Sequence, residues 1–215
     1  MLIQNYFLSK HLLINPYAVL KLRCVNRFRS KRCLFFLDLD GTLWPDRGPG
    51  AFFRQFDFFP EWKLFFKKRD SHRSVVLITN QTYFARKNQI SLWECILFYI
   101  KTLLLMHQTG ALLIYICNHH PNAQNTHLRQ ECKYRKPYPS MIIDSLRLLN
   151  HKSRFTYLIG DRISDMLAAN LGGVETPILI YNVKMFEENV SGRFSNNDFA
   201  FFEIMKLSEV DKKTN

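Results

Sequence analysis

The 215-residue chain lacks any uninterrupted apolar run of about 18 residues, the length that a membrane-spanning helix needs. Its richest apolar stretch, residues 90–106, is interrupted by Glu94 and Lys101. We therefore expect no transmembrane segment and interpret 90–106 as a helix that packs on a sheet. A secretory signal is not indicated either, because a lysine and an Asn-Pro pair interrupt the first apolar residues.

The sequence also lacks a regular cysteine framework. It has five cysteines, an odd number at irregular spacing, whereas disulfide-stabilised domains carry even numbers. We therefore expect a reducing compartment, the cytoplasm, with Cys24, Cys33 and Cys95 as plain thiols. We find no internal repeat. A hydrophobic content of 47% at this length is typical of one domain with a single core.

Acidic residues are absent from the first 34 positions. This leader carries seven of the basic side chains, Lys10, Lys21, Arg23, Arg27, Arg29, Lys31 and Arg32. Of the net charge of +12, 12 − 7 = +5 therefore belongs to the rest of the chain. Such a segment is compatible with a membrane-surface or nucleic-acid arm, a targeting peptide, a solvated extension, or upstream sequence read from an early start codon.

Two carboxylates follow the most informative apolar run in the chain. Leu34–Leu37 carries no charge and predicts a strand buried on both faces of a parallel sheet. Asp38 and Asp40 then lie at its carboxyl end, where open α/β sheets bind ligands, and Gly41 permits a sharp turn. Because neighbouring acids are costly without a cation or a proton, the pattern favours a functional site over a solvated loop.

Three later segments also combine an apolar run or a proline with polar residues. They are Val75–Ile78 before Thr79-Asn80-Gln81, Arg135-Lys136 before Pro137, and Tyr157–Gly160 before Asp161 and Asp165. Each is weak alone, but with Asp38 and Asp40 in this order they resemble the motifs of the haloacid dehalogenase superfamily. The resemblance implies an α/β, Rossmann-like fold, with a parallel five-stranded sheet flanked by helices.

Further segments make the resemblance narrower. They are Cys117-Asn118-His119-His120-Pro121 and Cys132-Lys133-Tyr134-Arg135-Lys136-Pro137. With the Thr-Asn-Gln and Gly-Asp segments, they are similar to the family of D,D-heptose 1,7-bisphosphate and histidinol-phosphate phosphatases. That family carries TNQ, C-x-H-H-P, C-x-C-R-K-P and GD-x-x-x-D in this order. The match extends from about Leu34 to Tyr181, most of the chain.

Apolar runs alternate with helical stretches along the chain. We expect strands near 34–38, 74–79, 111–116, 155–160 and 177–181, and helices near 60–69, 88–106, 138–150 and 164–171. This alternation predicts a parallel sheet with right-handed crossovers. Residues 44–59 predict a loop over the site, and no segment is long enough for a large cap domain. We divide the chain into a basic N-terminal extension (1–33), a haloacid dehalogenase-like phosphatase domain (34–182) and a C-terminal polar tail (183–215). Within the tail, we expect a short packed helix near 199–205.

The resemblance implies phosphoryl transfer to water with Mg²⁺. Asp38 would be the nucleophile that forms an aspartyl-phosphate, and Asp40 would be the general acid and base. Asp38 and Asp161 would hold Mg²⁺ by their side chains, and Asp40 would hold it by its backbone carbonyl. Thr79 would bind phosphoryl oxygens, and Lys136 would steady the developing negative charge.

The remaining candidates lie around this centre. Asn80 and Gln81 are expected to bind phosphoryl oxygens, and Arg135 is a candidate clamp for a second anionic group. Asp165 has two open roles, orienting the magnesium shell from outside or serving as a favourable acid at a helix N-terminus. We expect Arg162 on the surface.

A zinc site is a separate hypothesis. In the resembled family, C-x-H and C-x-C clamp a structural zinc through three thiolates and one imidazole. Cys117, His119 and Cys132 occupy three of these positions, but Tyr134 stands at the fourth. A closed structural zinc site requires four protein ligands, so the sequence does not decide whether zinc binds. His120, His127 or water could take the fourth position.

A second departure concerns Tyr83, which stands where the family has small residues and is expected to narrow or reshape the pocket. The substrate therefore stays open. We expect a monomer that hydrolyses a small phosphorylated metabolite, a sugar bisphosphate such as D-glycero-D-manno-heptose 1,7-bisphosphate. The alternatives are histidinol phosphate, a polynucleotide 3′-phosphate contacted by the basic leader, or a non-catalytic interaction protein. The sequence outside the leader shows no pattern of alternating basic and aromatic residues, which argues against a nucleic-acid substrate.

Overall fold

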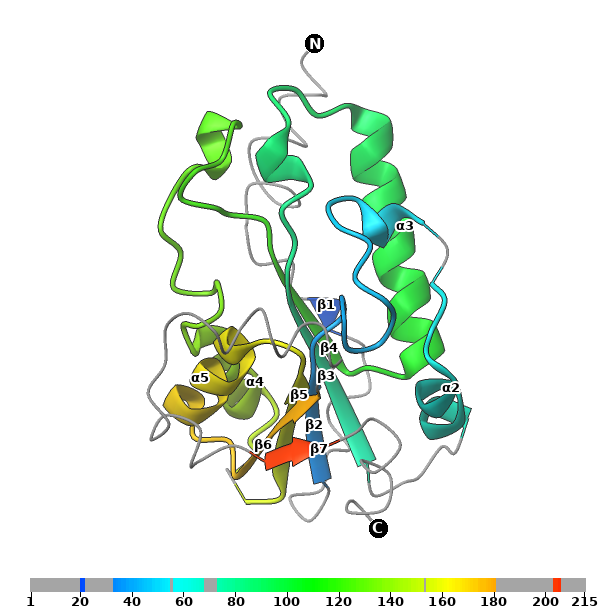
Figure 1. Cartoon of the computed structure of the whole chain (residues 1–215), viewed down its shortest axis with the longest axis vertical. Coiled ribbons are helices and arrows are strands. Elements are labelled where there is room, and N and C mark those ends of the chain that lie inside the picture. The colour runs from blue at the N-terminus through cyan, green and yellow to red at the C-terminus, as the bar shows by residue number, and fades with distance from the viewer. Residues whose placement is uncertain are drawn as a thin grey trace.

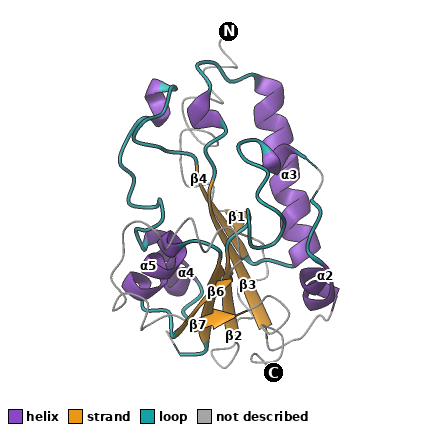
Figure 2. Cartoon of the chain, in the orientation of Figure 1, coloured by secondary structure: helices purple, strands orange, loops and turns teal. Residues whose placement is uncertain are grey.

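The computed structural model describes residues 20–21, 33–54, 56–67, 73–152, 154–180 and 203–205. Across these ranges, one twisted sheet forms the centre of the molecule and helices lie on both of its faces (Figure 1, Figure 2). Among these residues, no helix has the length and apolarity needed to cross a membrane.

Five parallel strands form the middle of the sheet. They are β2 (Cys33–Leu37), β3 (Arg73–Asn80), β4 (Leu113–Cys117), β5 (Thr156–Gly160) and β6 (Thr176–Ile180), in the spatial order β4-β3-β2-β5-β6. The predicted parallel five-stranded sheet is confirmed, and each strand lies within a few residues of its expected range. The chain order reverses at β2, which β3 and β5 flank. A reversal of this kind opens a ligand crevice at the carboxyl ends of the strands.

Two short strands extend the edges of this sheet. β1 (Leu20–Lys21) pairs antiparallel with β4, and β7 (Glu203–Met205) pairs parallel with β6. The prediction of a helix near 199–205 is therefore wrong for Glu203–Met205, which form a strand. The edge of β6 offers unpaired backbone groups, and an extended segment pairs with them. The rest of that segment and most of the basic leader lie outside the described residues. The limits 34–182 thus exclude two strands of the sheet.

Each face of the sheet buries its own apolar core. Alternate residues of β2 point to opposite sides, so that Phe35 lies in one core and Phe36 in the other. Full burial of such a ring contributes about 1.5–3 kcal/mol. Four helices cover these cores, α2 (Pro60–Lys67) and α3 (Leu92–Thr109) on one face, and α4 (Ser140–Leu148) and α5 (Ile163–Gly172) on the other (Figure 1).

The first turn of α3 is fixed by a capping box. The Ser91 hydroxyl accepts a hydrogen bond from the backbone N–H of Glu94 at 3.2 Å, and the Glu94 carboxylate accepts one from the backbone N–H of Ser91 at 2.9 Å. Both bonds satisfy donors that a helix start otherwise leaves unpaired. α3 therefore begins at Leu92, later than the predicted residue 88.

Candidate active site

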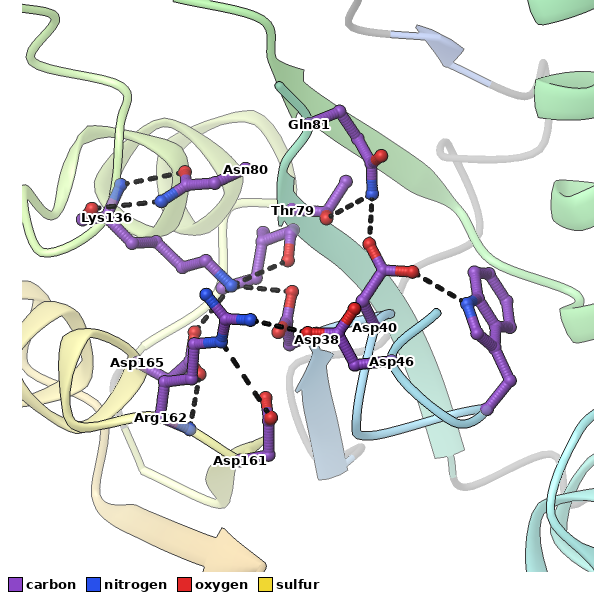
Figure 3. A network of polar contacts seen from close by, with 12 residues as sticks. Asp38, Asp40, Asp46, Thr79, Asn80, Gln81, Lys136, Asp161, Arg162 and Asp165 are labelled. Carbon is purple, nitrogen blue, oxygen red and sulfur yellow. Dashed lines mark hydrogen bonds and ion pairs between the residues drawn. The ribbon is translucent and has the colours of Figure 1, made fainter. Parts of the chain in front are cut away.

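Side chains from four parts of the chain meet at the carboxyl end of the sheet. Asp38 follows β2, Thr79 and Asn80 end β3, Lys136 lies in the loop before α4, and Asp161 follows β5 (Figure 3). The parallel register brings these strand ends to one edge. The structure thus assembles the residues that the sequence predicted.

The Lys136 ammonium is buried between two carboxylates. Its Nζ lies 2.6 Å from Oδ1 of Asp38 and 2.5 Å from Oδ1 of Asp165, and it donates to the Ile78 carbonyl at 3.3 Å. Burial alone would lower the pKa of Lys136, but the charges of Asp165 and Asp38 outweigh it and hold the pKa above its ordinary value. Lys136 is therefore a charged lysine that fixes the Asp38 carboxylate.

Asp165 is held by two contacts, one of which is the helix N-terminal position that the sequence offered as one of its two roles. Besides its ion pair with Lys136, its carboxylate accepts a hydrogen bond from the backbone N–H of Arg162 at 3.0 Å, at the start of α5. It is thus an acid at a helix N-terminus, a favourable position, and it holds Lys136 from the side opposite Asp38.

Asp161 is the group least matched by its surroundings. Among the described residues, neither of its buried carboxylate oxygens has a hydrogen-bond partner, and the guanidinium Nε of Arg162 lies 3.9 Å away. Burial, followed by the charges of Asp38 and Asp165, raises the pKa of Asp161 to about 8. Ligand atoms of Asp38, Asp161 and Asp165 lie within 4.8 Å of one another. The cluster has three carboxylates and a single ammonium group, that of Lys136, in contact with two of them. Carboxylate oxygens are the ligands that a divalent cation such as Mg²⁺ prefers, so the cluster fits such an ion.

Gly41 permits the close approach of the β2 turn to Asp161. Its φ is +81°, in the left-handed region, and a Cβ added there would lie 2.1 Å from Oδ2 of Asp161. Any side chain at this position would displace the acid, so the glycine is required by both the backbone and the space.

Two hydrogen bonds orient the Asp40 carboxylate. Trp44 donates to Oδ1 from its indole Nε1 at 2.8 Å, and Gln81 donates to Oδ2 from its amide at 2.6 Å. Burial raises the pKa of Asp40, the Trp44 bond opposes this, and the charge of Asp38 raises it further, so that the pKa stays above its ordinary value. The Gln81 amide also donates to the Thr79 hydroxyl at 3.1 Å.

The amide of Asn80 brackets the backbone of Lys136. It donates to the Lys136 carbonyl at 3.0 Å and accepts from the Lys136 N–H at 3.1 Å. Asn80 and Gln81 both line the cavity, as a substrate-binding residue would, but their amides are engaged by Lys136 and Asp40. Arg135 also lines the cavity and donates to the His119 carbonyl at 2.8 Å.

Asp38, Asp40, Thr79 and Lys136 line one cavity of about 480 Å³. The sequence predicted no place in this cavity for four of its charged or titratable lining residues, namely Asp46, Arg86, His120 and Arg162. Arg162, which is exposed as expected, donates a hydrogen bond to the Asp46 carboxylate at 2.7 Å (Figure 3). The only signal in the sequence was the position of Arg162 directly after Asp161.

The three expected zinc ligands also come together. Cys117, His119 and Cys132 are buried, their ligand atoms lie within 4.8 Å of one another, and the two Sγ atoms are 3.6 Å apart. Burial, with a further contribution from Cys132, raises the pKa of the Cys117 thiol to about 12. Tyr134, at the fourth position, donates a hydrogen bond from its hydroxyl to the Asp144 carboxylate. This donor set fits a thiophilic metal with three protein ligands.

Tyr83 does not lie among the residues that line the cavity, contrary to the expected narrowing of the pocket. Its ring instead packs against Phe53, with the ring centroids 4.5 Å apart. It therefore contacts the segment around Phe53 and not the cavity itself.

Comparisons with known proteins agree with this geometry. A family model described as HAD-hydrolase-like matches residues 133–182. The D-glycero-β-D-manno-heptose-1,7-bisphosphate 7-phosphatase of Photorhabdus laumondii is 32% identical over 153 residues, which cover 67% of this chain and 78% of the relative. The enzyme of the same name from Escherichia coli K12 is 30% identical over 149 residues, covering 67% and 77%.

Solved structures show the same fold. A protein described as a HAD-like phosphatase from Mesorhizobium loti superposes with a TM-score of 0.70 at 20% identity, covering 95% of both chains. A D,D-heptose 1,7-bisphosphate phosphatase from B. bronchiseptica, complexed with magnesium and phosphate, gives a TM-score of 0.61 at 22% identity and covers 84% of this chain and 97% of that one. Sequence, fold and site agree, and this chain belongs to the phosphatases of the haloacid dehalogenase superfamily, as a homologue of the heptose bisphosphate 7-phosphatases.

Proposed function

We propose that the chain hydrolyses a small sugar bisphosphate through an aspartyl-phosphate on Asp38. The observation that carries this proposal is the buried Asp38 carboxylate, held by Lys136 at 2.6 Å and open to a cavity that Asp40 also lines. A nucleophile fixed in this way does not have to be ordered during the reaction.

In the first step, a carboxylate oxygen of Asp38 forms a bond to phosphorus while the bond to the leaving oxygen breaks. Asp40 gives its proton to that leaving oxygen, and its raised pKa favours the protonated form that this step requires. In the second step, Asp40 takes a proton from water, the water oxygen attacks phosphorus, and inorganic phosphate leaves Asp38. Trp44 and Gln81 keep the Asp40 carboxylate in one orientation throughout.

Asp38, Asp161 and the backbone carbonyl of Asp40 would hold Mg²⁺, which fits the partnerless oxygens of Asp161. When bound, the ion supplies a positive charge that offsets the repulsion between a carboxylate and a phosphate dianion. The magnesium and phosphate in the B. bronchiseptica relative support this assignment. Thr79 would bind a phosphoryl oxygen, while Asn80 and Gln81 act by positioning Lys136 and Asp40.

The same cavity offers a place for a second phosphoryl group. Arg86, His120 and Arg135 line it together, and the charges of Arg135 and Arg86, after burial, lower the pKa of His120, which indicates that the three groups are close. Arginine grips phosphate in a bidentate manner, so a bisphosphate uses this cavity better than a monophosphate does. The homologous heptose bisphosphate phosphatases support the sugar as the scaffold.

Phosphate release from a substrate panel with Mg²⁺ tests the proposal. The panel contains D-glycero-D-manno-heptose 1,7-bisphosphate, histidinol phosphate and a 3′-phosphorylated oligonucleotide. We expect the bisphosphate to be hydrolysed with the highest kcat/KM, EDTA to stop the reaction, and Asp38→Asn to lower kcat by several orders of magnitude while the fold persists.

Asp57→Asn is the matched control, because Asp57 is an exposed acid that pairs only with surface cations, and this variant should keep full activity. Preference for either other substrate would refute the sugar bisphosphate. Activity that survives in Asp38→Asn would refute the nucleophile, and no release from any substrate would favour a non-catalytic protein.

A further inference from the structure

One wall of the cavity is a loop, residues 46–50, that contacts the opposite side of the site. Asp46, Gly48 and Pro49 line the cavity. Asp46 accepts a hydrogen bond at 2.7 Å from Arg162, 116 residues away in sequence. The position of this loop therefore affects the size of the cavity, which Arg162 also lines.

The loop rests on the ring of Tyr83. A Cβ added at Gly50, where φ is +89°, would lie 3.1 Å from Cδ2 of Tyr83, so the ring lies directly against the glycine backbone. The Phe53 ring, three residues further along, lies 4.5 Å from the Tyr83 ring between centroids. Tyr83 thus touches the loop at its end and just beyond it, at Gly50 and Phe53, and is not among the residues that line the cavity.

Tyr83 is in turn tied to the start of α3. Its hydroxyl donates to Oε1 of Glu94 at 2.6 Å, and Glu94 is the residue whose other oxygen closes the capping box with Ser91. Lys87 forms an ion pair with Glu94 and lies 4.8 Å from the centre of the Tyr83 ring. The anchor is therefore a helix end with its backbone donors satisfied, which is a rigid support.

We propose that Tyr83 is a positioning residue that holds the 46–50 loop against the start of α3 and thereby sets the size of leaving group the cavity accepts. This inference rests on the proposed function for its catalytic consequence only. The ring gives the loop a fixed resting place, which keeps Asp46 opposite Arg162 and keeps the cavity suited to a compact sugar phosphate. A loop without this support would admit larger esters and orient small ones less well.

Tyr83→Ala and Tyr83→Phe separate the ring from the hydroxyl. The first measurement does not depend on substrate and is the rate of tryptic cleavage after Arg47, followed by mass spectrometry. We expect Tyr83→Ala to speed this cleavage by about tenfold or more, because cleavage follows the population of the released loop. Tyr83→Phe keeps the ring on Gly50 but loses the hydroxyl contact with Glu94, so its cleavage rate should lie between those of the native protein and Tyr83→Ala. Phe53→Ala, which removes the second ring contact of Tyr83 with this segment, should also speed the cleavage.

The second measurement compares kcat/KM for the sugar bisphosphate and for a bulky aryl phosphate. In Tyr83→Ala the ratio of the bulky to the compact substrate should rise by about tenfold, chiefly through KM, whereas a general loss of structure lowers both values together. Native cleavage rates after Arg47 in both folded ring-removing variants would overturn the inference, as would an unchanged substrate ratio. If the native protein releases no phosphate from the sugar bisphosphate, the proposed function fails, and the proteolysis result still decides the role of Tyr83.

Discussion

Two buried clusters, each with three potential metal ligands, lie at the same end of the sheet and differ in the charge that burial allows them to carry. The acidic cluster is Asp38, Asp161 and Asp165, and the thiol cluster is Cys117, His119 and Cys132. Burial raises the pKa of Asp161 to about 8 and the pKa of Asp165 to about 6, because charged carboxylates in this cluster need compensation, which Lys136 supplies in part. In the thiol cluster, burial favours the neutral forms of Cys117 and His119, since it raises the pKa of Cys117 to about 12 and lowers the pKa of His119.

The comparison shows which cluster depends on a partner. A buried carboxylate without a counter-charge costs several kcal/mol, on the order of the whole stability of a small domain. A buried thiol packs as a small apolar group. The acidic cluster therefore depends on Lys136 for compensation and fits a cation, while the residues of the thiol cluster can pack in the core as small apolar groups.

The largest expected effect comes from removing the counter-charge of the acidic cluster. Lys136→Met leaves Asp38 and Asp165 buried without their ammonium partner, so we expect the free energy of unfolding at pH 7 to fall by about 3–5 kcal/mol. Chemical denaturation measures this value. Lys67→Met, which alters an exposed lysine at the end of α2, is the control. A loss no larger than that of the control would show that the two acids are compensated in another way.

Magnesium is expected to stabilise the acidic cluster alone. At a Mg²⁺ concentration 100 times the Kd, binding to the native state contributes about 2.7 kcal/mol, which a rise in Tm reports. Asp161→Asn should abolish this gain, and Cys117→Ala should keep it. An equal response in both variants would place the ion elsewhere than at Asp161.

The third prediction concerns the missing zinc ligand. Tyr134→Cys loses the hydroxyl contact with Asp144 and the ring stacked at 6.5 Å on Tyr115, so without zinc we expect a loss of about 1–2 kcal/mol. With zinc, the fourth thiolate should reverse this loss and raise the metal content to one equivalent. Elemental analysis and Tm in both conditions test this. Tight, chelator-resistant zinc in the native chain would contradict the weakened site.

The smallest effect is expected from breaking the thiol cluster itself. In metal-free protein, Cys132→Ala removes one buried sulfur and should lower the free energy of unfolding by about 1 kcal/mol, far less than Lys136→Met. Denaturation of the EDTA-treated protein gives this value. A loss as large as that of Lys136→Met would show that the two clusters contribute equally to the free energy of unfolding.

Much of the site was predictable because its signals are local. Asp38 and Asp161 each end an uncharged apolar run, so their place at strand ends follows from the pattern of the strand before them. Lys136 was identified by its place in an ordered set of motifs, and the parallel order of the five central strands followed from their alternation with helices. The role of Asp165 was left between two choices; the structure shows the contact at the helix N-terminus and, in addition, an ion pair with Lys136 that the sequence did not predict.

What the sequence by itself determined is therefore the alternation of strands and helices, the strand ends that carry the acids, and the hydrolase family. Only the tertiary structure decided the pairing of Asp46 with Arg162, the engagement of Asn80 with the Lys136 backbone 56 residues away, and the packing of Tyr83 on Phe53. Edge strands β1 and β7 were also missed, because two or three residues leave no periodic pattern. Such contacts join segments whose separation along the chain carries no information about their distance in space, so folding alone brings them together.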